Sequence, residues 1–317
     1  MRRYLLALLS LLCLVPAQAL AAGPSFRAVV SIAPQKYILE RIAGKDLDLE
    51  VTVLVKPGSD PHSYEPSPSQ MRAVAEAGYW FTIGVPFEDI WLPRIRGAAP
   101  GLCEISMAEG LRRLPMDDAA GHEKSPAPDQ DEQHGSDGLR AEDGDSGSHG
   151  GQDPHIWLSP VLVRAMTAKT AFTLACWFPD QRQALLDNGQ AFMRELDALD
   201  QSLALAFNEI PLKERVFLSF HPSWRYFALN YGLTELTIEV NGKEPGPRSM
   251  ASIVDAAKAH GIRTIFVEPQ FPRNAVAAIA KALDAKVVEA DPLAEKLPEL
   301  YRDLSDKLLE SFKDRQR

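Results

Sequence analysis

The sequence predicts an α/β protein with two lobes, each built on a mainly parallel sheet flanked by helices, and one long rigid helix that joins them. The first observation is that strand-like and helix-like segments alternate in both halves of the chain, with glycines after several of the helix-like segments. A helix often ends at a left-handed residue, which costs glycine least. The second is a central stretch of about 30 residues with apolar side chains at helical spacing and no internal proline.

The first 22 residues have the three parts of a secretory signal peptide. Arg2 and Arg3 precede an apolar run at residues 4–15, and small residues alternate over residues 17–21 in the pattern of a cleavage site. The apolar run is shorter than the roughly 20 residues that a membrane-spanning helix needs. Cys13 follows leucines rather than the small residue that normally precedes a lipid-anchor cysteine. We therefore expect residues 1–22 to be cleaved and the mature chain to be free in the periplasm.

The first lobe is predicted at residues 23–179. Three short runs rich in β-branched and aromatic residues are its predicted strands, namely residues 27–32, 49–55 and 79–83. A helix at residues 34–43 should end at Gly44. Residues 67–70 (SPSQ) combine a capping box with proline at the first helical position, so a second helix should begin there and stop at Gly78.

The linking helix is predicted at residues 180–209 and the second lobe at residues 210–317. Leu185, Phe192 and Leu199 belong to the regular apolar stripe of the linking helix, which would span about 45 Å. The strands expected in the second lobe are residues 215–220, 234–240, 263–267 and 286–289. The helices expected between them are one that ends at residue 230 and two at residues 249–260 and 274–285.

Residues 116–152 differ from the rest of the chain. They consist largely of Asp, Glu, Gly, Ser and Gln, with His122, His134 and His149 among them. This composition cannot bury enough apolar surface to order a chain, so we predict a disordered acidic loop. Such a tract can bind cations without fixed geometry, and whether this one binds metal stays open. The formal net charge of −9 argues against nucleic acid as a partner and favours cations weakly.

Two cysteines, Cys103 and Cys176, remain after the signal. A bridge between them is allowed in an oxidising compartment. Each also lies in an apolar stretch, so two buried free thiols fit the sequence equally well. Two cysteines form neither a disulfide framework nor a thiolate metal site.

Three of the remaining histidines have a similar local sequence. His62, His155 and His221 each lie beside prolines, which stiffen the backbone, and His62 and His221 come shortly after predicted strands. Open α/β sheets bind ligands beyond the carboxyl ends of their strands. Each residue alone is better explained as an ordinary loop histidine, but three on proline-stiffened turns together favour a metal site. His260 ends a predicted helix, where a cation offsets the helix dipole, so we interpret it as structural.

Carboxylates near predicted strand ends are candidates for the rest of the site. Asp291 follows the last strand and precedes Pro292, so it is either a fourth ligand or a turn cap. Glu268 ends another strand and is a candidate to orient a histidine from behind, as carboxylates do at metal sites. Glu65 is a candidate for the same role beside His62. We expect no catalytic or cofactor-binding residues.

Four motifs occur in order along nearly the whole mature chain. They are residues 56–66 (KPGSDPHSYEP), 153–158 (DPHIWL), the FHP, YF and YGL of residues 220–233, and 291–293 (DPL). In this order, with an acidic loop between the first two, they resemble the metal-binding solute-binding proteins of ABC importers for zinc and manganese, the zinc-specific branch in particular. The resemblance implies a metal ion in the cleft between two lobes. It implies that His62 and His155 come from the first lobe and His221 and Asp291 from the second.

The residue at position 221 bears on the choice of metal. Manganese-binding relatives carry a carboxylate where His221 stands, and imidazole suits zinc whereas manganese prefers oxygen ligands. The residues therefore favour zinc over manganese. Arg225 stands where relatives often have a small residue, and we expect its charge to point away from the metal.

The resemblance implies a monomeric periplasmic protein that captures zinc and delivers it to the membrane permease of an ABC transporter. Three imidazoles and one carboxylate would fill a tetrahedral shell and leave no water to activate, so we expect binding rather than catalysis. The alternatives are a zinc enzyme with an open fourth position, a manganese-specific binding protein, and a role without metal, such as an adhesin or a binder of an organic solute.

Overall fold

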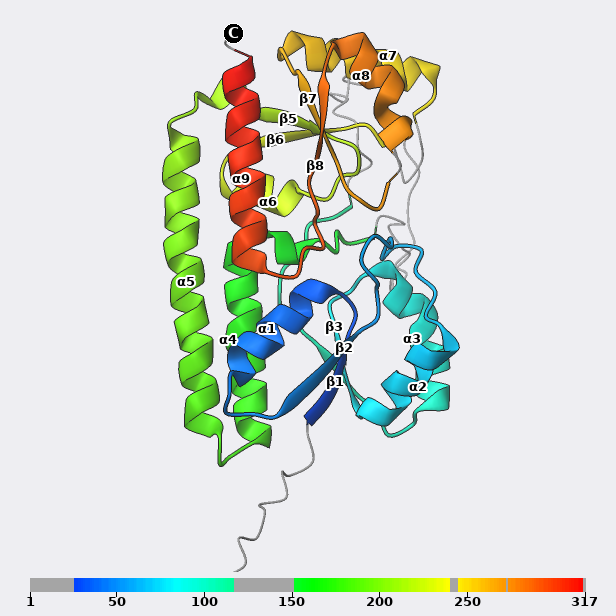
Figure 1. Cartoon of the computed structure of the whole chain (residues 1–317), viewed down its shortest axis with the longest axis vertical. Coiled ribbons are helices and arrows are strands. Elements are labelled where there is room, and N and C mark those ends of the chain that lie inside the picture. Colours follow the sequence, from blue (N-terminus) through cyan, green and yellow to red (C-terminus); the bar gives the residue numbers. More distant parts are fainter. Residues whose placement is uncertain (1–25, 117–150, 240–244, 272, 316–317) are drawn as a thin grey trace, which may run out of the picture.

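The computed structural model describes residues 26–116, 151–239, 245–271 and 273–315. The predicted signal peptide and most of the acidic segment, with His122, His134 and His149, lie outside these residues. Two sheets of four parallel strands form the centres of two lobes, which are stacked along the long axis of the molecule (Figure 1). The predicted fold class is confirmed.

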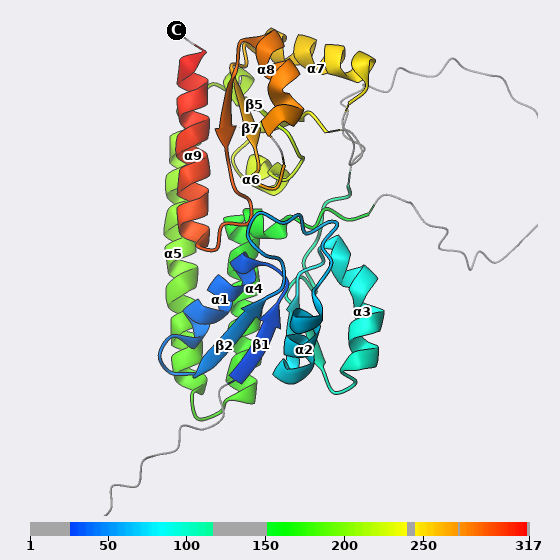
Figure 2. The ribbon, with the colours of Figure 1, turned by 45° about the vertical axis from the view of Figure 1, so that its right-hand side comes forward.

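The first lobe has the strand order β2-β1-β3-β4. Its elements are β1 (Phe26–Val30), α1 (Ala33–Ala43), β2 (Leu49–Val53), α2 (Pro68–Ala77), β3 (Tyr79–Thr82), α3 (Pro86–Ala98), β4 (Cys103–Ser106), a short 3-10 helix (Ile156–Leu158) and α4 (Pro160–Trp177). The predicted capping box is present, because the Ser67 side chain accepts the N–H of Gln70, and Gly78 ends α2 with a φ of 78°. Helix α1 lies on one side of the sheet and α2 and α3 on the other (Figures 1 and 2).

The second lobe repeats the arrangement with the strand order β6-β5-β7-β8. Its elements are β5 (Val216–Ser219), α6 (Arg225–Asn230), β6 (Thr234–Thr237), α7 (Pro247–Ala259), β7 (Thr264–Val267), α8 (Ala277–Leu283), β8 (Lys286–Glu289) and α9 (Leu297–Asp314). Every residue of β5 and β7 is buried, as expected for inner strands covered on both faces. Helix α8 ends earlier than predicted, because Asp284 adopts a left-handed φ of 49°.

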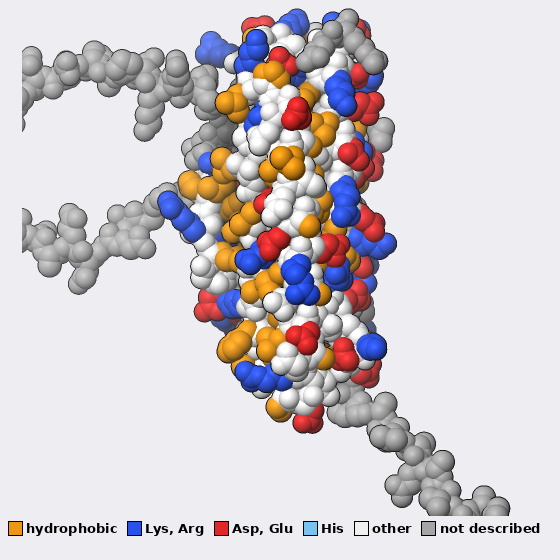
Figure 3. Space-filling model, turned by 90° about the vertical axis from the view of Figure 1, so that its left-hand side faces the viewer, with side chains coloured by type: hydrophobic (Ala, Val, Ile, Leu, Met, Phe, Trp, Pro, Cys, Tyr) orange, Lys and Arg blue, Asp and Glu red, His pale blue; other side chains and the backbone are white. Residues whose placement is uncertain are grey.

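The long helix α5 (Arg182–Asn208) has 27 residues and is about 40 Å long. Its buried stripe consists of Leu185, Gly189, Phe192, Leu196, Leu199, Leu203 and Phe207. The helix does not act as an isolated strut. It packs against α1 and α4 of the first lobe and against α9 of the second, so a layer of helices runs beside both sheets (Figures 1 and 2). On the outer face of this layer, basic and acidic side chains are interspersed, as on an ordinary solvated surface (Figure 3).

Both cysteines of the described chain are exposed and unbridged, so the expectation of buried thiols is wrong. Cys103 begins β4 at the edge of its sheet, and Cys176 lies on the outer side of α4, next to the buried Ala175. The apolar neighbours of each cysteine enter the core while the cysteine itself points outward. In the described residues, no helix is both long enough and apolar enough to cross a bilayer.

The contact between α4 and α5 gives a test of this helical layer. A Cβ atom built on Gly189 would lie 2.7 Å from Cβ of Ala171, which is closer than two side chains can approach. We expect Gly189→Ala to lower the free energy of unfolding by about 1–3 kcal/mol through overpacking. The control is Gly97→Ala in α3, where a new Cβ meets no atom within 4 Å and only helix propensity changes. Thermal unfolding of both variants measures this, and equal stability of the two would refute the tight packing.

Candidate metal centre

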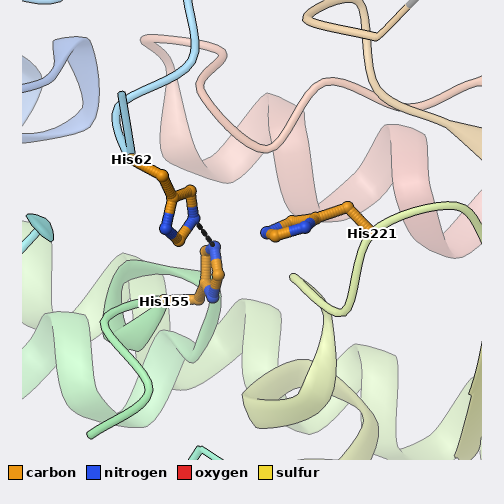
Figure 4. A group of neighbouring side chains, drawn as sticks. All are labelled: His62, His155 and His221. Carbon is orange, nitrogen blue, oxygen red and sulfur yellow. Dashed lines mark hydrogen bonds between the residues drawn. The ribbon is translucent and has the colours of Figure 1, made fainter. Parts of the chain in front are cut away.

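Three histidines far apart in the chain meet between the lobes (Figure 4). His62 lies between β2 and α2, His155 immediately precedes the short 3-10 helix, and His221 follows β5. Their ligand nitrogens all lie within 4.8 Å of one another. Nε2 of His62 is 3.4 Å from Nε2 of His155. Two nitrogens bound to one tetrahedral zinc ion at the usual distance would also be roughly 3.4 Å apart, so this pair already has the spacing of metal ligands.

Carboxylates fix two of the three rings from behind. Nδ1 of His155 donates to Asp153 Oδ1 (2.8 Å), and the same oxygen accepts the backbone N–H of His155 (3.0 Å). Nδ1 of His221 donates to Glu239 Oε2 (2.7 Å). In the neutral rings, a proton on Nδ1 leaves the lone pair of Nε2 directed at the other histidines. Nε2 of His221 is buried and has no hydrogen-bond partner among the residues that the structure describes, as expected for an atom that receives a metal ion.

The surroundings of the rings set different pKa values. Burial, together with the charges of His155 and His221, lowers the pKa of His62 to about 3. Burial also lowers the pKa of His155, in spite of Asp153. Burial acts in the same direction on His221, but the hydrogen bond and the charge of Glu239, with the nearby Glu268 and Glu235, raise its pKa above the ordinary value. His221 is therefore the most readily protonated of the three histidines.

The candidate fourth ligand, Asp291, does not lie within the cluster of histidine nitrogens. Its Oδ1 accepts hydrogen bonds from the backbone N–H of Leu293 (2.9 Å) and from Nε2 of Gln270 (3.2 Å). Gln270 and Leu293 line the pocket that contains the three histidines. The Asp291 carboxylate thus sits one hydrogen bond away from the residues of the pocket wall, in the place of a turn cap.

The other two candidate carboxylates do not hold a histidine ring. Glu65 is exposed, and the hydrogen bonds to the ring nitrogens of His155 and His221 come from Asp153 and Glu239. Glu268 is buried in the same pocket, and its Oε1 accepts a hydrogen bond from Ser223 Oγ (2.9 Å). Its Oε2 has no hydrogen-bond partner within the described segments of the chain. Burial raises the pKa of Glu268 to about 7.

Sequence reasoning missed Asp153 and Glu239, although each carries a usable signal. Asp153 stands two residues before His155, in a DPH segment that also contains a proline. Glu239 follows β6, the neighbour of β5 in the sheet, so the two strands bring it to the same edge as His221. The signal is a carboxylate that follows one strand of a sheet, when the histidine follows the neighbouring strand.

The segment of His155 is hydrogen-bonded to the second lobe. Tyr226 donates to the carbonyl of Asp153 (2.9 Å), and Tyr301 donates to the carbonyl of Trp157 (2.6 Å). Nε1 of Trp157 donates to the carbonyl of Pro292 (2.7 Å), and Trp157 lines the pocket that contains the three histidines. Arg225 donates to the carbonyl of Pro115 (2.7 Å) and is not among the residues that line this pocket.

Comparison with known proteins agrees with the motifs. Residues 28–315 match the family model described as "Zinc-uptake complex component A periplasmic" (ZnuA). A crystal structure of a ZnuA protein superimposes with a TM-score of 0.77 at 34% sequence identity, over 91% of this chain and 99% of that one. A zinc-bound deletion variant of a ZnuA protein gives a TM-score of 0.76 at 34% identity, over 91% and 98% of the two chains.

Among curated sequences, the zinc-binding protein AdcA of Streptococcus pyogenes is 23% identical over 278 residues. The aligned region covers 87% of this chain but 52% of AdcA, so the chain spans about half the length of this relative. The family resemblance expected from the four motifs is confirmed by the family match and by the solved ZnuA structures.

The pKa pattern predicts how metal affinity depends on pH. His62 and His155 have lowered pKa values and stay neutral in mild acid, whereas His221 gains a proton that competes with the metal. We expect affinity for a divalent ion to fall as the solution becomes mildly acidic, because His221 holds its proton more tightly than an ordinary imidazole, and about one proton should be released per ion bound near pH 6. Calorimetric titrations in buffers of different ionisation enthalpy count these protons. A release of more than two protons near pH 6 would show that all three rings titrate as ordinary histidines, with a pKa of about 6.5.

Proposed function

Because the chain belongs to the ZnuA family of periplasmic zinc-uptake components, we propose that it captures a zinc ion between its two lobes and delivers it to the membrane permease of an ABC importer. The observation that carries this proposal is the convergence of three imidazoles from separate loops, with their ligand nitrogens within 4.8 Å. Imidazole nitrogens suit zinc, and manganese sites prefer oxygen. The zinc-bound ZnuA structure, at 34% identity, supports the same choice of ion.

The proposed ligands are His62, His155, His221 and Asp291. The three histidines need little movement, because two of them already have ligand spacing and two are oriented by carboxylates. Asp291 would join them by a shift of the turn at residues 290–293, which borders the pocket through Pro292 and Leu293. A carboxylate as fourth ligand would complete a tetrahedral shell, and its negative charge would lower the net positive charge of the occupied site.

The proposed cellular setting follows from the family and from the sequence. The family description places its members in the periplasm, and residues 1–22 have the composition of a cleaved signal peptide. We propose that the mature protein acts there as a monomer and is not an enzyme. Its partners are then the zinc ion and a permease, which receives the ion when docking disturbs the shell.

The residue assignment is tested by zinc titration of single variants. His155→Ala and His221→Ala should each weaken zinc binding by two or more orders of magnitude, because each removes one of four ligands together with a preoriented ring. His260→Ala is the matched control, since His260 caps α7 away from the histidine cluster and should leave affinity unchanged. Calorimetry with a competing chelator measures all three. Wild-type affinity in either ligand variant would mean that zinc binds elsewhere.

A second candidate function is hydrolysis by a zinc-bound water. The observation that favours it is the position of Asp291 outside the histidine cluster, which leaves three nitrogen ligands, as in catalytic zinc sites. Zinc-loaded protein should not accelerate hydrolysis of an activated ester beyond the rate of the same protein without zinc. An acceleration that is lost in His221→Ala would favour the enzyme over the binding protein.

A further inference from the structure

The carboxylate of Asp291 is held through one of its two oxygens. Within the described part of the chain, both of its hydrogen-bond donors, the N–H of Leu293 and Nε2 of Gln270, point at Oδ1. Gln270 also lines the pocket of the three histidines, and its Oε1 is buried without a hydrogen-bond partner in residues 26–116, 151–239, 245–271 and 273–315. Gln270 therefore connects the wall of the metal pocket to the candidate fourth ligand.

Two adjacent strands fix the positions of these residues. Strands β7 and β8 pair in parallel with Val267 opposite Glu289, so both segments leave the sheet at the same edge. The turn after β7 is closed by a hydrogen bond from the N–H of Phe271 to the carbonyl of Glu268 (3.0 Å). The N–H of Ala290 donates to the carbonyl of Val267 (3.0 Å). The backbone of the second lobe thus holds the segments of Gln270 and Asp291 side by side, within reach of the hydrogen bond between their side chains.

The number of oxygens that a carboxylate offers changes the geometry of a metal site. A carboxylate binds a cation through one oxygen or through both. One oxygen with three imidazoles gives four ligands, which is the geometry that zinc prefers. Two oxygens would give five, and manganese favours higher coordination with more oxygen. Oδ1 of Asp291 already accepts two N–H groups, which occupy its two lone pairs and leave Oδ2 for a metal.

We propose that Gln270 confines Asp291 to binding through one oxygen and thereby selects zinc over manganese. The proposal rests on the proposed function, because it takes Asp291 as the fourth ligand. Gln270 is a positioning residue that acts through Asp291. Glu268 is the other carboxylate that could serve as the fourth ligand. It lines the same pocket, and among the described residues its Oε2 has no hydrogen-bond partner.

The test uses the whole mature chain freed of metal. Gln270→Met keeps the length of the side chain and removes the amide. Gln183→Met is the matched control, because Nε2 of Gln183 also donates to a carboxylate, Asp187 Oδ1 (2.9 Å), on the exposed surface of α5. Cobalt(II) serves as the probe, since its visible absorption is strong in four-coordinate sites and weak at higher coordination. We expect Gln270→Met to weaken this absorption and to lower the ratio of zinc to manganese affinity about tenfold, while Gln183→Met changes neither.

Gln270→Met is also made in an Asp291→Ala chain, which tests whether Gln270 acts on the metal through Asp291. If Gln270 acts through Asp291, Gln270→Met has no additional effect in that background. A wild-type cobalt spectrum and affinity ratio in Gln270→Met would overturn the proposal, as would an equal effect with and without Asp291. A cobalt spectrum that changes in Glu268→Gln and not in Asp291→Ala would assign the carboxylate ligand to Glu268 and also overturn it.

The histidine variants separate this proposal from the function on which it rests. If His155→Ala and His221→Ala keep wild-type zinc affinity, the proposed function fails and the role of Gln270 fails with it. If they lose zinc while Gln270→Met behaves as the wild type in both measurements, zinc capture stands and only the selection by Gln270 is refuted.

Discussion

Helix α5 packs against both lobes, and this packing largely determines how far apart the two sheets lie. One apolar stripe contacts α1 and α4 on the first lobe and α9 on the second. The loop after β2, which carries His62, and the loop after β5, which carries His221, face each other across the separation that these helices fix. A group of nitrogens within 4.8 Å tolerates little error in that separation. The close approach of Gly189 to Ala171 shows how tightly α5 is held against α4 of the first lobe.

The electrostatic surroundings of the three histidines favour the binding of a cation. Removal of the imidazoles from water lowers the pKa of His62 and His155, so these rings are ready to donate lone pairs at neutral pH. Asp153 and Glu239 hold the far sides of two rings and place negative charge just outside the cluster. A divalent ion bound here would lie among neutral nitrogens with carboxylates behind them. That arrangement compensates the charge of the ion without using oxygen as the main ligand.

The elements that could be predicted from the sequence are those with local signals. The Ser67 capping box, the glycines after α1, α2 and α7 and the β-branched runs gave most strands and helices of both lobes. Helices α3, α4 and α9 and strand β4 were not predicted. In α4 the exposed Val161 and Phe172 reduce the contrast between its faces, so its periodicity is weak. The order of the strands, and with it the meeting of the three histidines, depends on contacts between residues more than 90 positions apart.

The grouping of the three histidines could be predicted because its signal is also local. Proline-flanked histidines after strands are a local pattern, and His62, His155 and His221 do lie together. The partners of their rings depend on side-chain direction, which sequence spacing does not specify, so Asp153 and Glu239 were missed. Asp291 remains a predicted ligand, held at present by Leu293 and Gln270.

The hydrogen bonds of Tyr226, Trp157 and Tyr301 decide to which lobe the segment of His155 is attached. By chain position His155 belongs with His62, but these three bonds tie its segment to the second lobe. If the two sheets moved apart, either these three hydrogen bonds would break or His155 would move together with His221. Because the 3-10 helix after His155 also packs against α4, His155 is connected to both lobes, whereas His62 is held by the loop after β2 alone.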